Sequence, residues 1–242
     1  PAGVLNVLCA DSANSIEIGA VLCSSDVVRH LSFTGSTEVG RILARQCAPS
    51  IQKLSLELGG NAPFIVFDDA DLDKAVEGAM ISKFRNNGQT CVCANRIYVQ
   101  AGVYDAFAEK LSVAVGKLSI GDGLTEGVNT GPLINADAVE KVEEHIADVL
   151  AGGGKIVTGG KRHALGGTFF EPTVVTGVTP AMKVANEETF GPLAPLFKFD
   201  TEEEVIRRAN DTTFGLASYF YARDIGRITR VQEQLEYGMA GG

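Results

Sequence analysis

Residues 30–67 read HLSFTGSTEVGRILARQCAPSIQKLSLELGGNAPFIVF, a stretch in which apolar runs alternate with turns of small residues. The turn around Gly35 separates the first apolar run from a run with apolar residues on one helical face, for which Ser36 or Thr37 is a natural N-cap. Strands that alternate with helices predict an α/β sheet. The apolar runs predict strands at 30–33, 51–58 and 62–67.

The same alternation extends along the rest of the chain. After Asp71, apolar residues at positions 72, 75, 76, 79, 80 and 84 follow the spacing of one helix face. This pattern ends at Asn86-Asn87-Gly88, and an irregular stretch at 89–93 precedes the next strand. We expect further helices at 14–23, 103–117, 135–151, 202–210 and 224–235, and further strands at 4–8, 96–99, 155–158, 173–176, 195–199 and 217–222.

Composition limits the classes of function. The chain has 242 residues, 45% of them hydrophobic, which is enough for one large or two small globular domains. A net charge of −9 and short basic runs argue against nucleic acid as a partner. No apolar stretch approaches the ~18 residues of a membrane helix. We therefore expect a soluble protein with neither a membrane nor a nucleic-acid partner.

Cysteine usage indicates a reducing compartment. Five irregularly spaced cysteines in a chain of this length do not suggest a disulfide framework, so we expect the cytoplasm or the mitochondrial matrix. The histidines are scattered, and Cys91-Val92-Cys93 lacks the spacing of a zinc site, so no metal is expected. The chain starts at Pro1 without an initiator methionine, and we expect both ends to be cuts.

Two turns are candidates for chemistry. The strand–turn–helix stretch Phe33–Gly40 directs backbone N–H groups and a helix N-terminus at whatever lies there, which suits a phosphate, although a plain tight turn is the commoner explanation. Cys91 follows Gly88-Gln89-Thr90 just after a helix, where backbone amides can stabilise a thiolate or an oxyanion. The alternative for Cys91 is a small buried side chain.

Charged residues at three places in the sequence can each have a functional role or an ordinary structural one. Glu57 ends an apolar strand, so we expect partial desolvation that raises its pKa toward that of a general base; the alternative is a solvent-accessible edge charge. Glu187-Glu188 precede an aromatic residue and a turn, a pattern also typical of solvated loops. Arg85 can clamp a carboxylate with two N–H groups, or can be a surface residue near a helix end.

Four motifs, taken in order, resemble the aldehyde dehydrogenase superfamily and cover essentially the whole chain. They are Phe33-Thr34-Gly35-Ser36, Leu56-Glu57-Leu58-Gly59-Gly60, Gly88-Gln89-Thr90-Cys91 and Glu188-Thr189-Phe190-Gly191-Pro192. Within the superfamily, the chain looks most like the succinate-semialdehyde dehydrogenases, on the stretches 83–93, 159–163 and 191–195.

The resemblance implies a fold and a reaction. Residues 1–58 are expected to be the end of a doubly wound NAD(P)-binding domain, and 59–242 an α/β catalytic domain that lacks its C-terminal end. The implied reaction is NAD(P)-dependent oxidation of an aldehyde, as in GABA degradation, where succinate semialdehyde becomes succinate. The alternatives are another semialdehyde or aliphatic aldehyde as the substrate, and a catalytically silent fragment that retains the fold.

The resemblance also implies residue roles. Cys91 is the nucleophile, which passes through a thiohemiacetal and a thioester, and Glu57 is the base that activates water to hydrolyse the thioester. We further expect Arg85 to fix the far carboxylate of a C4 semialdehyde, and Cys93 to form a redox switch with Cys91. NAD or NADP is the expected cofactor. We expect Glu188 to bind the ribose of the cofactor and Phe190 to pack near its nicotinamide ring. Gly35 and Ser36 are expected to contact the pyrophosphate, and Leu58 to make a further contact with the cofactor.

The chain also departs from the family pattern. The amide side chain that completes the oxyanion hole and the lysine that contacts the adenosine ribose lie upstream in the family, so the preference between NAD and NADP is open. Ala10 stands where the family has a glycine. The family continues beyond Gly242 into an aldehyde-pocket loop and an oligomerisation strand. We therefore expect part of an enzyme that is inactive alone, and a homo-oligomer for the full-length protein.

Overall fold

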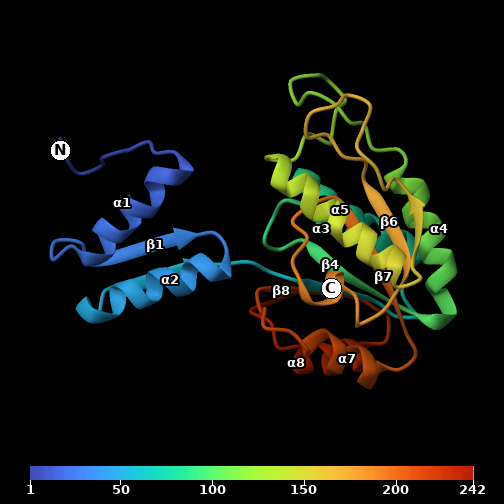
Figure 1. Cartoon of the computed structure of the whole chain (residues 1–242). Helices are drawn as coiled ribbons and strands as arrows, with labels where there is room; N and C mark the ends of the chain where they lie inside the picture. The colour runs from blue at the N-terminus through green and yellow to red at the C-terminus, as the bar shows by residue number, and fades with distance from the viewer. Residues whose placement is uncertain (242) are drawn as a thin grey trace. The chain divides into compact units, whose positions relative to one another are not determined.

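Two units make up the chain, Pro1–Gly59 and Gly60–Gly242, each with a core of its own. The computed structural model describes residues 1–241, and Figure 1 shows their helices and strands. Within residues 1–241, no helix is long and apolar enough to cross a membrane. The same residues contain no group of three or more His, Cys, Asp or Glu side chains placed to hold a metal ion.

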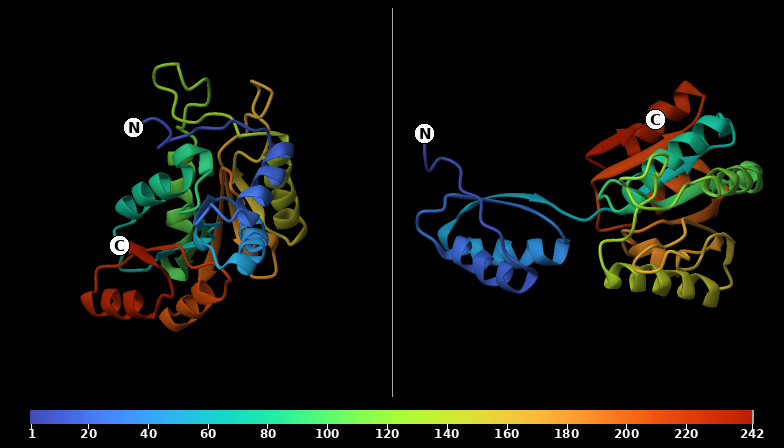
Figure 2. Two further views of the ribbon diagram at one scale, coloured as in Figure 1. Left: turned by 90° about the vertical axis from the view of Figure 1, so that its left-hand side faces the viewer. Right: turned by 90° about the horizontal axis from the view of Figure 1, so that it is seen from above.

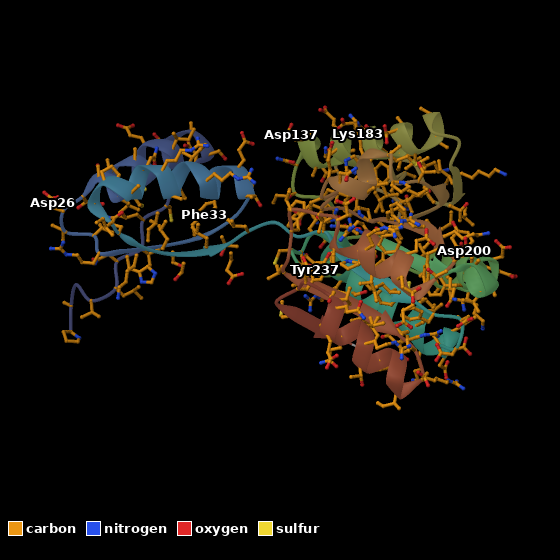
Figure 3. All side chains as sticks on the ribbon, turned by 90° about the horizontal axis from the view of Figure 1, so that it is seen from below. Asp26, Phe33, Asp137, Lys183, Asp200 and Tyr237 are labelled. Atoms are coloured by element: carbon orange, nitrogen blue, oxygen red, sulfur yellow. The ribbon has the colours of Figure 1, made fainter. Side chains whose placement is uncertain are left out.

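The first unit is a short parallel sheet with helices on one face. Strands β1 (His30–Thr34) and β2 (Lys53–Glu57) pair in parallel, and helices α1 (Ser12–Ser24) and α2 (Thr37–Cys47) lie on the same side of them (Figure 2). The 3-10 turn η1 (Ala48–Ser50) follows α2. Phe33, labelled in Figure 3, belongs to its small apolar core. The other core residues are Cys23, Leu31, Leu43, Cys47 and Leu54.

The strand expected at residues 4–8 is wrong. These residues form no strand, and the side chains of Val4, Leu5, Val7 and Leu8 are 75% to 84% exposed. A strand needs a neighbouring strand to take its backbone hydrogen bonds, and in the described residues no third strand pairs with the open edge of β1 or of β2. An apolar run alone does not supply that partner.

The second unit is a seven-stranded sheet in the order β5-β6-β7-β4-β3-β8-β9, and every neighbouring pair except β5 and β6 is parallel. The strands are β3 (Ala62–Val66), β4 (Ala94–Gln100), β5 (Lys155–Thr158), β6 (Thr173–Val178), β7 (Leu193–Phe199), β8 (Ala217–Tyr221) and β9 (Met239–Gly241). The helices are α3 (Leu72–Phe84), α4 (Tyr104–Val115), α5 (Ala136–Ala151), α6 (Lys183–Asn186), α7 (Glu202–Asn210) and α8 (Ile225–Gln234), with 3-10 turns η2 (Arg85–Gly88) and η3 (Ala101–Val103).

Alternate residues of each central strand pack against different helices. In β3, Phe64 and Val66 lie in the core that contains α3 and α4, whereas Ile65 lies in the core that contains α5 to α8. A parallel strand buried on both faces needs a continuous apolar run, which is what residues 62–67 supply. The α/β fold predicted from the sequence is confirmed.

Most expected helices and strands agree with the structure to within a few residues at each end. Helix α3 begins after Asp71, whose carboxylate accepts the backbone N–H groups of Asp73 and Lys74 at 3.2 Å. Ser36 caps α2 by accepting the N–H of Val39 at 3.3 Å. Helix α6 and strand β9 were not predicted, because four and three residues are too few for a periodic pattern.

The parallel arrangement brings separate segments to one edge of the sheet. Because the strands run in one direction, the residues that precede β3, β4, β7, β8 and β9 lie along the same edge, which we call the amino edge. The glycines at 59–60, the cysteine loop at 89–93 and the acidic segment at 187–192 are three of these preceding segments. Their motifs are therefore neighbours in space.

Ion pairs close the opposite edge, where the strands end. Arg227 of α8 lies 2.6 Å from Asp69 and 3.1 Å from Asp68, both of which follow β3, and 3.3 Å from Glu202 at the start of α7. Arg230 also pairs with Glu202, at 2.7 Å. These charges occupy the edge at which parallel α/β sheets usually bind their ligands.

A buried cation ties the centre of the sheet to the C-terminal segment. Arg96 in β4 is 1% exposed, and its guanidinium donates to the carbonyl oxygens of Asn61 and Ala209 at 2.9 Å. It also donates at 2.7 Å to the hydroxyl of Tyr237, which Figure 3 labels. Each such hydrogen bond to a charged group contributes about 1.5–3 kcal/mol.

Replacing Arg96 should therefore destabilise the second unit. We expect Arg96→Met to lower the free energy of unfolding by about 3 kcal/mol, because buried acceptors lose their donor. Urea unfolding followed by circular dichroism measures the change. Arg207→Met, at an exposed position on α7, is the control and should stay within about 0.5 kcal/mol of the unmodified chain. Equal stability of the two variants contradicts the anchoring role of Arg96.

Candidate active site

Two backbone segments meet at Gly60. A Cβ atom added to Gly60 would collide with the carbonyl oxygen of Cys91, so only glycine permits this approach. The N–H of Gly60 donates to Oε1 of Glu188 at 3.1 Å. This glycine therefore joins the segment before β3 to the cysteine loop and to the acidic segment before β7.

A second close approach, at Gly88, joins the cysteine loop to the acidic segment again. A Cβ atom on Gly88 would collide with the carbonyl oxygen of Gly191, and Gly88 has a left-handed φ of 76°. Asn86 and Asn87, with φ of 51° and 56°, are left-handed as well, a conformation that asparagine tolerates better than most residues. These left-handed residues turn the chain sharply after α3, where the helical sequence pattern ends.

Side chains from other parts of the unit hold the cysteine loop. Oε1 of Gln89 accepts the N–H of Ile134 at 2.9 Å. The hydroxyl of Tyr219 in β8 donates to the carbonyl oxygen of Val92 at 2.8 Å. The side chain of Cys91 is half-buried in this loop, which is fixed on both sides of the thiol.

Cys93 is fully buried and already has polar neighbours. Its Sγ lies 2.8 Å from the hydroxyl of Thr90 and 3.7 Å from the carbonyl oxygen of Lys83. A disulfide with Cys91 would require Cys93 to leave these neighbours. All five cysteines are free thiols in the structure, and the redox switch stays a prediction.

Glu188 supplies the carboxylate of the site. Burial raises the pKa of its carboxyl above the ordinary value, while the hydrogen bond from Gly60 and the charge of Lys83 act in the opposite direction. Oε1 accepts the amide of Gly60, and a carboxylate retains further acceptor capacity on its other oxygen. A ribose hydroxyl is a suitable donor for that oxygen.

Phe190 follows two residues later with an exposed ring. It is 40% exposed, and its φ of 50° places a bulky side chain in the left-handed region, a strain typical of functional segments. A carboxylate with acceptor capacity, two residues before an exposed aromatic ring, has the chemistry to contact the polar ribose and the flat ring of a nicotinamide riboside, and both roles stay predictions. The residues present therefore suit the nicotinamide end of NAD(P).

Helix α5 holds the acidic segment. The ring of His145 is fully buried, with its nitrogens 3.0 Å from Oγ1 of Thr189 and 3.2 Å from Oε2 of Glu187. Burial lowers the pKa of His145, which favours the neutral ring. The ion pair with Lys141 lowers the pKa of Glu187. Glu187 is thus engaged in holding the segment, whereas Glu188 accepts the N–H of Gly60.

Arg85 lies beside a groove at the amino edge. The groove has a volume of about 390 Å³, and Arg85, Val92, Ser218 and Tyr219 are among the residues that line it. Val92 directly follows Cys91, so the guanidinium and the cysteine loop border the same groove. This placement supports the role expected for Arg85, which stays a prediction.

The remaining expected site residues lie in the first unit. The N–H of Gly35 donates to the carbonyl oxygen of Glu57 at 3.0 Å, and the hydroxyl of Ser36 caps α2. The other N–H groups of the first turn of α2 remain as donors for an anion. Leu58 packs against Gly40 of α2. The cofactor contacts expected of Gly35, Ser36 and Leu58 stay predictions.

The expected desolvation of Glu57 is wrong for this unit. Its side chain is exposed, because alternate residues of β2 point to opposite faces and only Leu54 and Leu56 are partly buried. Since β2 belongs to a two-stranded sheet, it is an edge strand. The structure agrees with the alternative stated for Glu57, a charged side chain on an edge strand that is accessible to solvent. The role of Glu57 as the base stays a prediction.

Lys83 and Asn95 are polar residues of the site that were not predicted from the sequence. Lys83 is fully buried on α3, and its Nζ donates to Oδ1 of Asn95 at 2.8 Å. Lys83 lies four residues after Ala79, a position on the apolar face of the helix. A lysine on a face that is otherwise apolar was the signal that could have identified it.

The fold and the site define a class of α/β protein with a cysteine loop and an acidic segment at the amino edge of a mostly parallel sheet. The chain belongs to the aldehyde dehydrogenase family, whose model matches residues 1–241. The resemblance seen in the sequence is confirmed.

Relatives match the whole of this chain. It is 65% identical over 241 residues to a succinate-semialdehyde dehydrogenase (NADP(+)) of Escherichia coli and 66% identical to a glutarate-semialdehyde dehydrogenase of Pseudomonas aeruginosa, covering 100% of this chain and 49% of each relative. A crystal structure of succinate-semialdehyde dehydrogenase from Burkholderia pseudomallei matches with a TM-score of 0.97 and 66% identity, covering 100% of this chain and 49% of that one. The chain thus spans about half the length of the curated relatives it matches.

The contact at Gly60 predicts a specific sensitivity. Gly60→Ala should lower the free energy of unfolding by about 1–3 kcal/mol, because backbone must move to admit the methyl group. It should also change the alkylation rate of Cys91 by iodoacetamide, measured by peptide mass spectrometry. Gly102→Ala, where nothing lies within 4 Å of the added atom, is the control. Wild-type stability and labelling in Gly60→Ala refute the close approach.

Proposed function

We propose that this chain carries the thiol chemistry of an NAD(P)-dependent aldehyde dehydrogenase and that its substrate is a semialdehyde, with succinate semialdehyde the best candidate. The first unit would contribute the end of the nucleotide-binding domain, and the second unit the catalytic residues. The observation that carries the proposal is the meeting of Cys91, Gly60 and Glu188 at the amino edge. The family membership supports it.

The chain's own residues account for the steps of this oxidation. The thiolate of Cys91 attacks the aldehyde carbon, and its backbone N–H stabilises the oxyanion of the thiohemiacetal. NAD(P)⁺, when bound, would supply the acceptor for the hydride that the carbon loses as the thioester forms. By the family resemblance, the base that accepts a proton from the hydrolytic water would be Glu57; hydrolysis of the thioester releases the acid and restores the thiolate. Glu188 would hold the ribose of this cofactor by accepting a hydrogen bond, and Phe190 would pack beside its nicotinamide ring.

The groove beside Arg85 supports an aldehyde with an anionic far end. A guanidinium binds a carboxylate through two parallel hydrogen bonds. The two named relatives act on succinate semialdehyde and glutarate semialdehyde according to their names, and both compounds carry such a carboxylate. Glutarate semialdehyde is therefore the second candidate. The name of the Escherichia coli relative favours NADP over NAD.

Absorbance of the reduced cofactor tests the proposed function. We would assay the 242-residue chain, and a chimera in which it replaces the matching segment of the Escherichia coli relative, with succinate semialdehyde and NAD⁺ or NADP⁺. In the chimera, Cys91→Ser should reduce turnover by roughly a thousandfold or more, because a hydroxyl is a far weaker nucleophile at neutral pH. Cys9→Ser, at an exposed cysteine, is the control. A chimera that folds but has no activity refutes the proposal. If the chimera is active and the 242-residue chain alone is not, the chain is a part of the enzyme that does not catalyse the reaction by itself.

Arg85 should determine the preference for charged aldehydes. In the chimera, Arg85→Ala should raise the KM for succinate semialdehyde by about tenfold or more, since a charge-assisted hydrogen bond contributes about 1.5–3 kcal/mol. Butanal, which has no carboxylate, is the internal control and should be oxidised as before. Equal losses on both aldehydes remove the argument for an anionic substrate.

A further inference from the structure

Lys83 is a buried cation that the proposed chemistry does not use. A buried ammonium group is stable only where its charge is compensated and its N–H groups are bonded. Its Nζ donates to Oδ1 of Asn95 at 2.8 Å, which is a neutral acceptor. The titratable groups whose charges act on it are the carboxylate of Glu188 and the thiol of Cys93. Glu188 is the carboxylate of the two, and hydrogen bonds through Asn95 and Gly60, not a direct ion pair, connect it to Lys83.

Asn95 connects the cation to Gly60. Because Oδ1 of Asn95 accepts from Lys83, its Nδ2 is left to donate, and Nδ2 lies 3.5 Å from the carbonyl oxygen of Gly60. The N–H of Gly60 in turn donates to Glu188 at 3.1 Å. The peptide groups of Gly60 are thus held on both sides, one by Asn95 and the other by Glu188.

We propose that Lys83 is a positioning residue for cofactor binding: it is the buried countercharge of Glu188 and, through Asn95, it keeps the amide of Gly60 on that carboxylate. This proposal rests on the proposed function in one respect, namely that Glu188 binds the nicotinamide ribose. Lys83 acts through its neighbours and not on the reacting atoms. Gly60 also contacts the backbone of Cys91. Gly60 therefore fixes the position of the cysteine loop relative to the carboxylate of Glu188.

In this arrangement, the pKa values of Lys83 and Glu188 should depend on each other. Burial lowers the pKa of Lys83 to about 8, so the group is still mostly an ammonium at neutral pH and loses its charge as the pH rises further. Burial raises the pKa of Glu188, and the charge of Lys83 opposes that increase. Loss of the proton from Lys83 should therefore favour the protonated form of Glu188.

Carbon-13 NMR of the glutamate carboxyl groups tests the countercharge in the 242-residue chain, with Glu188→Gln identifying the signal of Glu188. Lys83→Met should shift the midpoint of the Glu188 titration upward, because removing a nearby cation favours the neutral carboxyl. Lys74→Met is the matched control, since Lys74 is an exposed lysine of the same helix that pairs with Glu77. An unchanged midpoint in Lys83→Met overturns the proposal.

The unmodified chain provides a second test that does not depend on the folding of a variant. The side-chain signal of Lys83 should titrate near pH 8, and the carboxyl signal of Glu188 should inflect at the same pH. A Glu188 signal without this inflection overturns the countercharge.

Kinetics of the chimera separate a positioning role from a merely structural one. Lys83→Met should raise the KM for NADP⁺ by about fivefold at acidic pH, where loss of the cation favours the protonated form of Glu188, and by less as the pH rises. A structural defect would instead lower kcat at every pH, and that result overturns the role in cofactor binding. A shifted Glu188 midpoint in the chain together with an inactive chimera refutes the proposed function but supports the countercharge.

Discussion

The candidate site depends on the contact between the Cα of Gly60 and the carbonyl group of Cys91, which leaves no room for a side chain. Because this contact fixes Gly60 against the cysteine loop, the amide of Gly60 can hold the carboxylate of Glu188. The approach of Gly88 to Gly191 fixes the same two loops at another point. Close packing of backbone, rather than any single strong bond, therefore sets the distance between thiol and carboxylate.

The location of the site follows from the direction of the strands. Ligands of parallel α/β sheets usually bind where the strands end, but here that edge is closed by the ion pairs of Arg227 and Arg230. The segments that precede β3, β4 and β7 carry Gly60, Cys91 and Glu188 instead. The sheet order places these strands side by side, since β4 lies between β3 and β7.

Sequence reasoning succeeded where local rules operate and failed where the outcome depends on distant partners. The helix at 72–84 and its cap at Asp71 follow from spacing and from a short polar side chain, and both are present. The apolar run at 4–8 forms no strand, and Glu57 is exposed because it lies on the face of β2 opposite Leu54 and Leu56. The network of Lys83 and Asn95 could not be predicted, because it depends on which strand neighbours α3 and on burial that no spacing rule reports.

The two edges of the sheet differ in how freely the length of their loops can change. Cys91 is separated from β4 by two residues and Gly60 from β3 by one, so an insertion there would move a site residue away from the strand that holds it. The other edge is joined by long arginine side chains, which can reach carboxylates over a range of backbone positions. Over evolutionary time, insertions and deletions should therefore collect in the turns where the strands end and be rare in the short segments where they begin.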